Sequence, residues 1–264
     1  MMLLLLACSE PAPTPEDANG CNGHDVLCER AVDEVVFLRS HNSHASEERG
    51  YSVFSMNHYE AIPTQLADGV RSLNIDIYEE DGVLLACHGF CELGQQPLLE
   101  VLDELGTFLA ENPREVVLLD VQDEAPEGAV QTAIADHGLP LADIAPGAWP
   151  TLGALVDEGT TLVYLHPHGD YVYSTGWQYD TPEDLDCATT PFEGGLYEVT
   201  HVLTNPLANP DNATLINGRD VMLEHIDRCI DEVGLPNQVS VDFYSIGDTV
   251  AVVDELNGVT TAPE

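Results

Sequence analysis

The sequence predicts an α/β protein with a parallel sheet, of the (β/α)8 TIM-barrel type and distorted from the ideal closed form. Apolar runs typical of strands alternate along the chain with segments of helical periodicity. Polar residues gather at the carboxyl ends of several of these runs, where barrel enzymes carry their sites. The length of 264 residues suits one large domain better than two small ones.

The first strands are predicted from apolar runs in the amino-terminal third. Residues 35–38 form a short apolar run between polar neighbours, which is typical of a buried strand. Residues 71–78 alternate from residue 73 onward, which predicts a strand with one apolar and one polar face. The apolar face holds Leu73, Ile75 and Ile77, and the polar face holds Asn74, Asp76 and Tyr78. Another strand at 83–87 follows the Asp81-Gly82 turn signal.

Later elements continue the alternation. Residues 97–111 have apolar side chains at helical spacing, and a strand at 115–122 follows the Asn112-Pro113 break. Further strands are predicted at 161–165 and 238–244, with a helix at 219–232.

The amino terminus predicts export. Residues 1–8 are an apolar run that ends in Leu5-Leu6-Ala7-Cys8, which resembles a bacterial lipobox in which Cys8 is lipidated after cleavage. The Pro-rich residues 9–20 then form a flexible linker, and residues 21–264 a single domain. We therefore expect a protein of the bacterial cell envelope, tethered through Cys8, or a secreted one. The run is shorter than a usual signal and lacks a basic leader, so a chance apolar end is the alternative.

The charge balance restricts the partners. The chain has 47 acidic and 7 basic residues, a formal net charge of −40. Binding nucleic acid requires a Lys/Arg surface that displaces counterions, so nucleic acid is not an expected partner. Long-range attraction to an anionic membrane is disfavoured for the same reason. We expect a monomer with a highly soluble surface.

Six cysteines remain after Cys8, and an even number in an exported chain indicates disulfides. Closeness in sequence favours Cys21–Cys28 and Cys87–Cys91, which leaves Cys187–Cys229. The alternative is a metal site, which the absence of any C-x-x-C pair argues against.

Two histidines follow predicted strands. His41-Asn42 comes after the first strand and offers an imidazole for proton transfer and an amide oxygen for a hard cation. His88 follows another strand and is flanked by Cys87 and Cys91, whose disulfide would hold it rigidly. Either motif alone is weak, since a loop histidine is more often only solvated.

Oxygen donors lie on the strands near these histidines. Asn74 and Asp76 share one strand face, and Asp120 and Gln122 repeat the pattern on a later strand. A buried Asp76 must be paired or bound to metal. Oxygens from Asn42, Asn74, Asp76 and Asp120 would suit Ca²⁺. Tyr164 and Tyr244 are candidates to line a substrate pocket, and the histidines at 166–168 are a weaker metal candidate.

These features in this order resemble the X region of phosphatidylinositol-specific phospholipase C. The resemblance runs from Cys28 to Glu124 and rests on four features: His41-Asn42, the stretch 65–76, Cys87-His88-Gly89, and the strand at 116–122. It covers about a third of the chain and implies a phospholipase C-like phosphodiesterase barrel. The stretch 239–244 is similar to a late barrel strand of this family.

The resemblance also implies roles. His41 would be the general base that deprotonates a substrate hydroxyl, and His88 the general acid that protonates the leaving oxygen. The first product would be a cyclic phosphodiester. Asp242 would orient His41, and Arg71, inside the matched stretch, is a further catalytic candidate.

Asp76 stands where calcium-dependent members of the family carry Asp and metal-independent bacterial members carry Arg, so Ca²⁺ is the implied cofactor. Asn74 departs from the family's acid at that position, which should lower the affinity for metal, and Asp120 and Gln122 compete for a later ligand position.

Two alternatives stay open. The chain could act on glycerophosphodiesters or sphingolipids, although the closely spaced Glu and Asp ligands of those enzymes are not seen after His41. It could also be a tethered, non-catalytic binding protein on a degenerate phosphodiesterase scaffold, for which Asn74 is the best support.

Overall fold

The computed structural model describes residues 20–123, 125–126, 128–165, 171–205 and 207–259. The predicted signal remnant at 1–8 with Cys8, nearly all of the linker at 9–20, and the histidines at 166–168 lie outside the described residues. No helix in the described ranges has the length and apolar character needed to cross a membrane.

Ten strands form one sheet, and seven α-helices are described around it. The strands are β1 (Phe37–Ser40), β2 (Ser72–Glu80), β3 (Val83–Ala86), β4 (Gln96–Pro97), β5 (Val117–Asp123), β6 (Leu141–Ala142), β7 (Leu162–Leu165), β8 (Val172–Ser174), β9 (Leu196–His201) and β10 (Gln238–Val241). The helices are α1 (Ile62–Ala67), α2 (Leu98–Glu111), α3 (Ala129–His137), α4 (Leu152–Glu158), α5 (Pro210–Ile216), α6 (Arg219–Glu232) and α7 (Thr249–Asn257).

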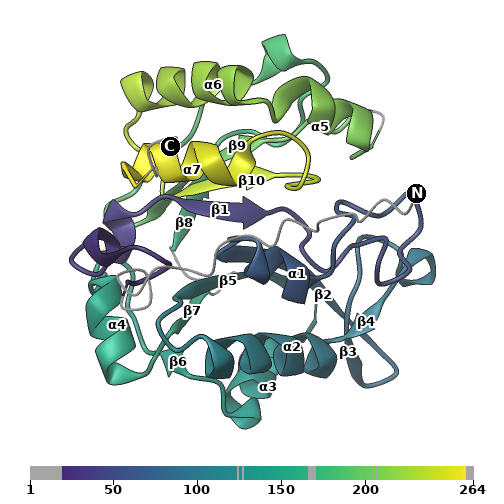
Figure 1. The fold of residues 1–264 in the computed structure, drawn as a ribbon. Coiled ribbons are helices and arrows are strands. Elements are labelled where there is room, and N and C mark those ends of the chain that lie inside the picture. The colour runs from purple at the N-terminus through teal and green to yellow at the C-terminus, as the bar shows by residue number, and fades with distance from the viewer. Residues whose placement is uncertain (1–19, 124, 127, 166–170, 206, 260–264) are drawn as a thin grey trace, which may run out of the picture.

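The sheet is a curled, open half-barrel. Its strand order is β6-β7-β5-β2-β1-β10-β9-β8, and all neighbours on this path are parallel. The long end of β2 forms an antiparallel extension with β3 and β4. Helices α6 and α7 cover one side, and α2 and α3 cover another (Figure 1). The predicted α/β barrel class is confirmed, with the distortion that no described pair joins β6 to β8.

Element boundaries differ at the last predicted strand, where β10 ends at Val241 and not at residue 244, and at the first strand. It was expected at 35–38, but β1 spans Phe37–Ser40. Val35 belongs to the segment before the strand, where it packs with Leu27 and Val32. An apolar run reports burial and not backbone conformation, so this shift of two residues could not be seen in the pattern. The helix at 219–232 was predicted with its observed bounds.

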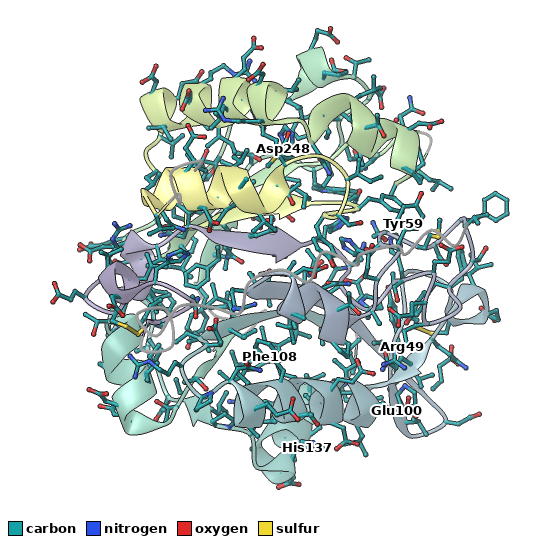
Figure 2. The ribbon with its side chains drawn as sticks, viewed as in Figure 1. Arg49, Tyr59, Glu100, Phe108, His137 and Asp248 are labelled. Carbon is teal, nitrogen blue, oxygen red and sulfur yellow. A yellow bond between two sulfur atoms is a disulfide. The ribbon has the colours of Figure 1, made fainter. Side chains whose placement is uncertain are left out.

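The main core lies between the sheet and its helices. Leu73, Ile75 and Ile77 of β2 are fully buried and pack in one cluster with Leu102 and Leu105 of α2. Alternation along the strand places the intervening polar residues on the opposite, concave face. Phe108 of α2, labelled in Figure 2, packs against the same core.

The concave face is layered. At the amino ends of the strands Phe37, Leu118 and Leu196 join an apolar cluster with the segment that precedes β1. Two residues further along the same three strands stand Arg39, Asp120 and Glu198. Because the strands are parallel, each layer lies at one height of the half-barrel, and the carboxyl ends above the charged layer are open for a site.

The three disulfides are those expected from closeness in sequence. Cys21 pairs with Cys28, Cys87 with Cys91, and Cys187 with Cys229. The Cys87–Cys91 bridge closes the loop that carries His88, as expected. The Cys187–Cys229 bridge joins a loop after β8 to helix α6.

Candidate functional site

His41 lies at the carboxyl end of β1 and is oriented by Asp242, which follows β10. Their side chains meet with His41 Nδ1 2.9 Å from Asp242 Oδ1. The carboxylate accepts, so Nδ1 carries the hydrogen and Nε2 keeps its lone pair. Burial lowers the pKa of His41, but the Asp242 carboxylate outweighs it, and the net pKa is raised above 6.5. The pKa of Asp242 is lowered in return, because the His41 interaction outweighs its burial.

Two residues of the loop before α1 support this pair. The side-chain amide of Asn57 donates to Asp242 Oδ1 at 2.7 Å, which fixes the carboxylate. His58 Nε2 donates to the backbone carbonyl of His41 at 2.8 Å, which fixes the turn after β1. Sequence reasoning missed both residues, because nothing in a loop sequence shows which strand end it contacts.

His88, in the loop after β3, is held in a similar way. Its Nδ1–H donates to the carbonyl of Ser55 at 2.9 Å, which leaves Nε2 free of that contact. Cys87 and Cys91, on either side of it, are disulfide-bonded and buried. The half-buried imidazole is thus fixed in orientation and remains partly exposed to solvent.

The Asp76 carboxylate is buried and interacts with the charges of both histidines. It is 5% exposed, and burial raises its pKa, while the nearby His41, His88 and Arg39 charges lower it. His41 contacts Asp242, and Asp76 lies near enough to both imidazoles for their charges to act on its pKa. His41, His88, Asp76 and Asp242 therefore lie in one region of the structure, and their roles stay predictions.

The amide of Asn42 lies between His41 and Asp76. It is 3.2 Å from His41 Nε2 and 3.2 Å from each Asp76 carboxylate oxygen. With its nitrogen toward Asp76 it donates to the carboxylate. With its oxygen toward Asp76, three acceptor oxygens converge, which is an arrangement suited to a cation. Asn42 and Asp76 therefore fit a Ca²⁺ ion whose other ligands are water or substrate.

The other two expected ligands are engaged elsewhere. Asn74 Oδ1 accepts from the backbone N–H of Asn42 at 3.0 Å. The Asp120 carboxylate is ion-paired with Arg39. In the strand register Gln122, not Asp120, lies beside Asp76. The four-residue calcium set is therefore reduced to two converging residues, with Gln122 as their neighbour on β5.

Arg39 is the charged residue that sequence reasoning missed. It is buried, and its guanidinium joins Asp120 of β5, Glu198 of β9 (2.6 Å) and Ser240 of β10 (2.8 Å) across the concave face. A lone arginine after an apolar run must find buried partners, which was the available signal. Its partner Glu198 could not be found, because β9 was not predicted.

A polar cavity of about 250 Å³ opens above this charged layer. Its lining includes Arg39, Asn74, Asp120, Gln122, Glu198 and Tyr171. Tyr164 and Tyr244, predicted to line a substrate pocket, are not in the lining of this cavity, and neither are His41 and His88. Tyr164 packs against the main core on the helix side of the sheet. Tyr244 is buried, and its hydroxyl donates to Asp68 at 2.7 Å.

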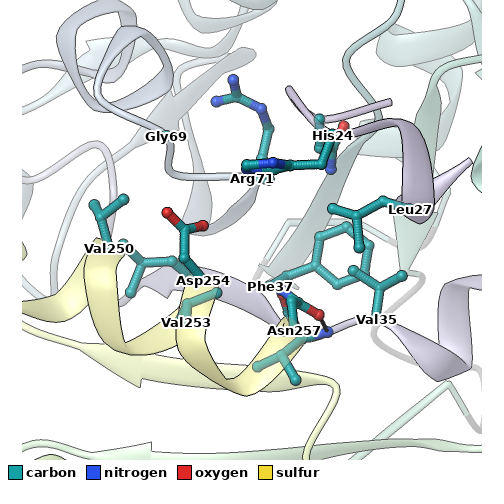
Figure 3. Close-up of a pocket in the computed structure, with 13 residues that line it drawn as sticks. His24, Leu27, Val35, Phe37, Gly69, Arg71, Val250, Val253, Asp254 and Asn257 are labelled. Atoms are coloured by element: carbon teal, nitrogen blue, oxygen red, sulfur yellow. Dashed lines mark hydrogen bonds between the residues drawn. The ribbon is translucent and has the colours of Figure 1, made fainter. Parts of the chain in front are cut away.

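Arg71 is also placed away from the site, which corrects its assignment as a catalytic candidate. It precedes β2, five residues before Asp76, at the amino ends of the strands. It pairs with Glu115 at 2.7 Å and donates to backbone carbonyls. Figure 3 shows it in a second cavity of about 160 Å³ with His24 and Asp254. The matched stretch placed Arg71 close to Asp76 in sequence, but not at the same end of the sheet.

We predict that Arg71→Gln leaves phosphodiester cleavage within about two-fold of the wild type, because no catalytic group touches it. Its loss leaves Glu115 unpaired, which should lower the free energy of unfolding by about 1–3 kcal/mol. Urea unfolding beside a cleavage assay measures both. A large loss of cleavage with unchanged stability would return Arg71 to the site.

Two further histidines are buried beneath the site in neutral form. Burial lowers the pKa of His44 to about 3, and His88 and His41 add to the effect. Burial likewise lowers the pKa of His58 to about 4. Both residues are at most 1% exposed, so protonating either ring would leave an ion in the core.

These low pKa values predict acid-dependent stability. The unfolded chain takes up protons at these histidines below their ordinary pKa of 6.5, whereas the folded chain resists until about 3 to 4. Their contribution is therefore complete above pH 6.5 and is lost progressively as the pH falls through that window. The urea midpoint of unfolding is measured at about pH 7.5 and about pH 5. Its decrease between the two pH values should be smaller for His44→Gln than for the wild type. An equal fall in both would contradict the assignment.

Comparison with known proteins identifies relatives of this site. The family model of the PI-PLC X domain (PI-PLC X 1) matches residues 27–175, which contain His41, Asp76 and His88. A PI-PLC X domain-containing protein 1 of Arthroderma benhamiae is 26% identical over 286 residues, covering 93% of this chain and 92% of the relative. An uncharacterized secreted protein of the same fungus is 27% identical over 175 residues, covering 61% of this chain and 39% of its own.

Solved structures share the fold. Phosphatidylinositol-specific phospholipase C from Staphylococcus aureus superposes with a TM-score of 0.59 over 92% of this chain and 98% of its own, at 14% identity. The enzyme of the same name from Listeria monocytogenes gives 0.57 over 89% and 96%, at 13% identity. At these identities the likeness establishes the barrel fold alone.

Proposed function

Because the chain belongs to the PI-PLC X domain family, we propose that it is a phosphoric diester hydrolase or lyase of the phospholipase C type. The observation that carries the proposal is the pairing of two oriented imidazoles around Asp76. His41 is fixed through Nδ1 by Asp242, and His88 through Nδ1 by the Ser55 carbonyl. The hydrogen on Nδ1 leaves each ring its Nε2 for the proposed proton transfer, and at His41 this nitrogen faces the Asn42 amide at 3.2 Å.

In the proposed first step His41 Nε2 removes a proton from the substrate hydroxyl next to the phosphodiester. That oxygen forms a bond to phosphorus, which begins to close a cyclic phosphodiester. Asp242 stabilises the imidazolium that forms, because its carboxylate already accepts from Nδ1–H. The raised pKa of His41 makes it a stronger base than an isolated histidine.

His88 completes the step as the general acid. In its protonated form Nε2–H gives its proton to the alcohol oxygen as the bond between that oxygen and phosphorus breaks. The alcohol leaves neutral, and the cyclic phosphodiester stays on the headgroup. Water can then open the ring by the reverse proton transfers, with His88 as base and His41 as acid.

Calcium remains part of the proposal, with Asn42 and Asp76 as the protein ligands. When bound there, Ca²⁺ would supply positive charge against the phosphate oxygens. The pairing of Asp120 with Arg39 and the use of the Asn74 oxygen by Asn42 favour weak binding over a closed site.

The proposed substrate is phosphatidylinositol or its soluble headgroup phosphodiester, after the names of the solved relatives. At a net charge of −40 the protein should be repelled by anionic lipid, so a soluble headgroup, bridging calcium or screening salt is required. Three disulfides and a relative named as secreted support export of the chain. That the chain acts as a monomer remains a prediction. A lipid anchor at Cys8 remains a prediction.

The proposal is tested with a panel of phosphodiesters assayed in the presence of calcium and of a chelator. The panel includes phosphatidylinositol in neutral detergent micelles, its soluble headgroup diester, a glycerophosphocholine and sphingomyelin. We expect release of inositol phosphate, reduced by chelator. Choline release alone would favour the glycerophosphodiester or sphingolipid alternative.

A second candidate is a non-catalytic binding protein on the same scaffold. The engaged states of Asn74 and Asp120 favour it, since they remove two of the expected metal ligands. Calorimetry with Ca²⁺ and a phosphodiester, run beside the cleavage assay, separates the two. Binding without turnover would support this second candidate.

A further inference from the structure

A second cluster of reactive side chains lies outside the site, beneath helix α6. His225 and Cys229 are one helical turn apart on α6, and Cys187 reaches them from the loop that precedes β9. One ligand atom from each of Cys187, His225 and Cys229 lies within 4.8 Å of the others. All three residues are at most 4% exposed.

The hydrogen-bond contacts of His225 and His201 require one more N–H group than the two neutral rings carry. His225 Nε2 lies 3.1 Å from the Asp186 carbonyl, and His201 Nε2 lies 3.0 Å from the Ile216 carbonyl. The two Nδ1 atoms face each other at 2.9 Å. Carbonyls only accept, so three contacts need three N–H groups, whereas two neutral imidazoles supply two.

Protonation would make up the difference only at a cost. His201 and His225 are at most 3% exposed, so a third hydrogen would leave an imidazolium ion in the core. A buried donor or acceptor without a partner is costly, so the contact needs another explanation. Binding of a cation by one His225 nitrogen removes the need for the third hydrogen.

The surroundings indicate which nitrogen would bind. The Asp186 carbonyl that His225 Nε2 contacts is also 3.9 Å from Cys229 Sγ, so Nε2 lies on the side of the sulfurs. With Nε2 as the ligand, His225 Nδ1–H donates to His201 Nδ1, and His201 Nε2–H donates to Ile216. Every nitrogen then has one role, and the outer hydrogen bond is of the kind that orients metal-binding histidines.

We propose that Cys187, Cys229 and His225 form a Zn²⁺-class metal site when their disulfide is reduced. A dithiol reduces the bridge by thiol–disulfide exchange, which yields two protein thiols and the oxidised dithiol. The metal ion then displaces one proton from each thiol and binds two thiolates, His225 Nε2 and a water molecule. The disulfide and the metal are two mutually exclusive ways of joining α6 to the loop at 185–195. The inference does not depend on the proposed phosphodiesterase activity.

The test uses the full chain reduced anaerobically with a phosphine, with Co²⁺ as the spectroscopic probe. We expect one equivalent of Co²⁺ to give the visible absorption of tetrahedral cobalt and a sulfur-to-cobalt charge-transfer band, both removed by Zn²⁺. The oxidised protein should give neither. If reduction alone unfolds the chain, Zn²⁺ should restore the native far-UV circular dichroism.

Matched variants locate the site. Cys187→Ser/Cys229→Ser keeps the other cysteines and should lose both bands, whereas replacing Cys21, Cys28, Cys87 and Cys91 by Ser should retain them. His225→Gln should lose the tetrahedral spectrum, and His201→Gln should weaken affinity by about 10–100-fold as an orienting partner. No cobalt spectrum in the reduced wild type, or an unchanged spectrum in Cys187→Ser/Cys229→Ser, would overturn the proposal.

Discussion

His41→Ala is expected to lower kcat/KM for phosphodiester cleavage by about 10²–10⁴-fold, the range that one general acid–base residue contributes. Among the described side chains, only His41 contacts Asp242 through a ring nitrogen, and its other nitrogen faces the Asn42 amide at 3.2 Å. Removing it takes away the proton acceptor, and no neighbouring group has the same orientation. The measurement is steady-state cleavage by protein whose circular dichroism matches the wild type.

His88→Ala should lower kcat/KM by a similar factor. The double variant should lower it by much less than the product of the two single factors, because both residues act in one step. His137→Ala is the matched control. His137 ends α3 on the helix side of the sheet and pairs with Asp103 (Figure 2). If His41→Ala and His88→Ala cleave as fast as His137→Ala, the proposed roles are wrong.

Asp242→Asn should lower kcat by up to about 10⁴-fold, the scale measured for the equivalent carboxylate of a Ser-His-Asp triad. The amide can offer an N–H to His41 Nδ1, which would favour the tautomer with hydrogen on Nε2. The pH profile should change as well. His41 must be neutral to act as base, so wild-type activity falls as the pH drops through its raised pKa. Without the carboxylate that pKa falls, and the acidic limb should move to lower pH.

The matched control is Asp248→Asn. Asp248 is exposed at the start of α7 and accepts from the backbone N–H of Arg219 (Figure 2). It should retain both the rate and the pH profile. An Asp242→Asn variant with a reduced rate but an unmoved acidic limb would mean that Asp242 acts through packing and not through the charge on His41.

Much of the fold could be predicted because the alternating pattern of β2 is clear in the sequence. Leu73, Ile75 and Ile77 alternate with polar residues, and each side proved to face the environment that its chemistry requires. Strand β9 could not be found in this way. Its apolar face toward the main core holds only Tyr197 and Val199, so the alternation is shorter than that of β2.

The residues of the site also fall into those that could be predicted from the sequence and those that could not. His41, His88 and Asp76 could be predicted, because residues that follow parallel strands meet at one end of the sheet. Arg39, Asn57 and the engagement of Asp120 depend on which strands become neighbours across the half-barrel. The closeness of Arg71 to Asp76 in sequence predicts the wrong end of the sheet, because a step of five residues along an extended chain spans the length of a typical strand.

The central claim is that two imidazoles around Asp76 form a cyclic phosphodiester. The most direct test follows the soluble or micellar inositol phosphodiester by ³¹P NMR during cleavage by the wild-type protein. The account predicts a cyclic phosphodiester as the first phosphorus-containing product, which later opens to the monoester. A monoester formed without the cyclic intermediate, or folded protein that turns over no diester of the panel, would contradict it.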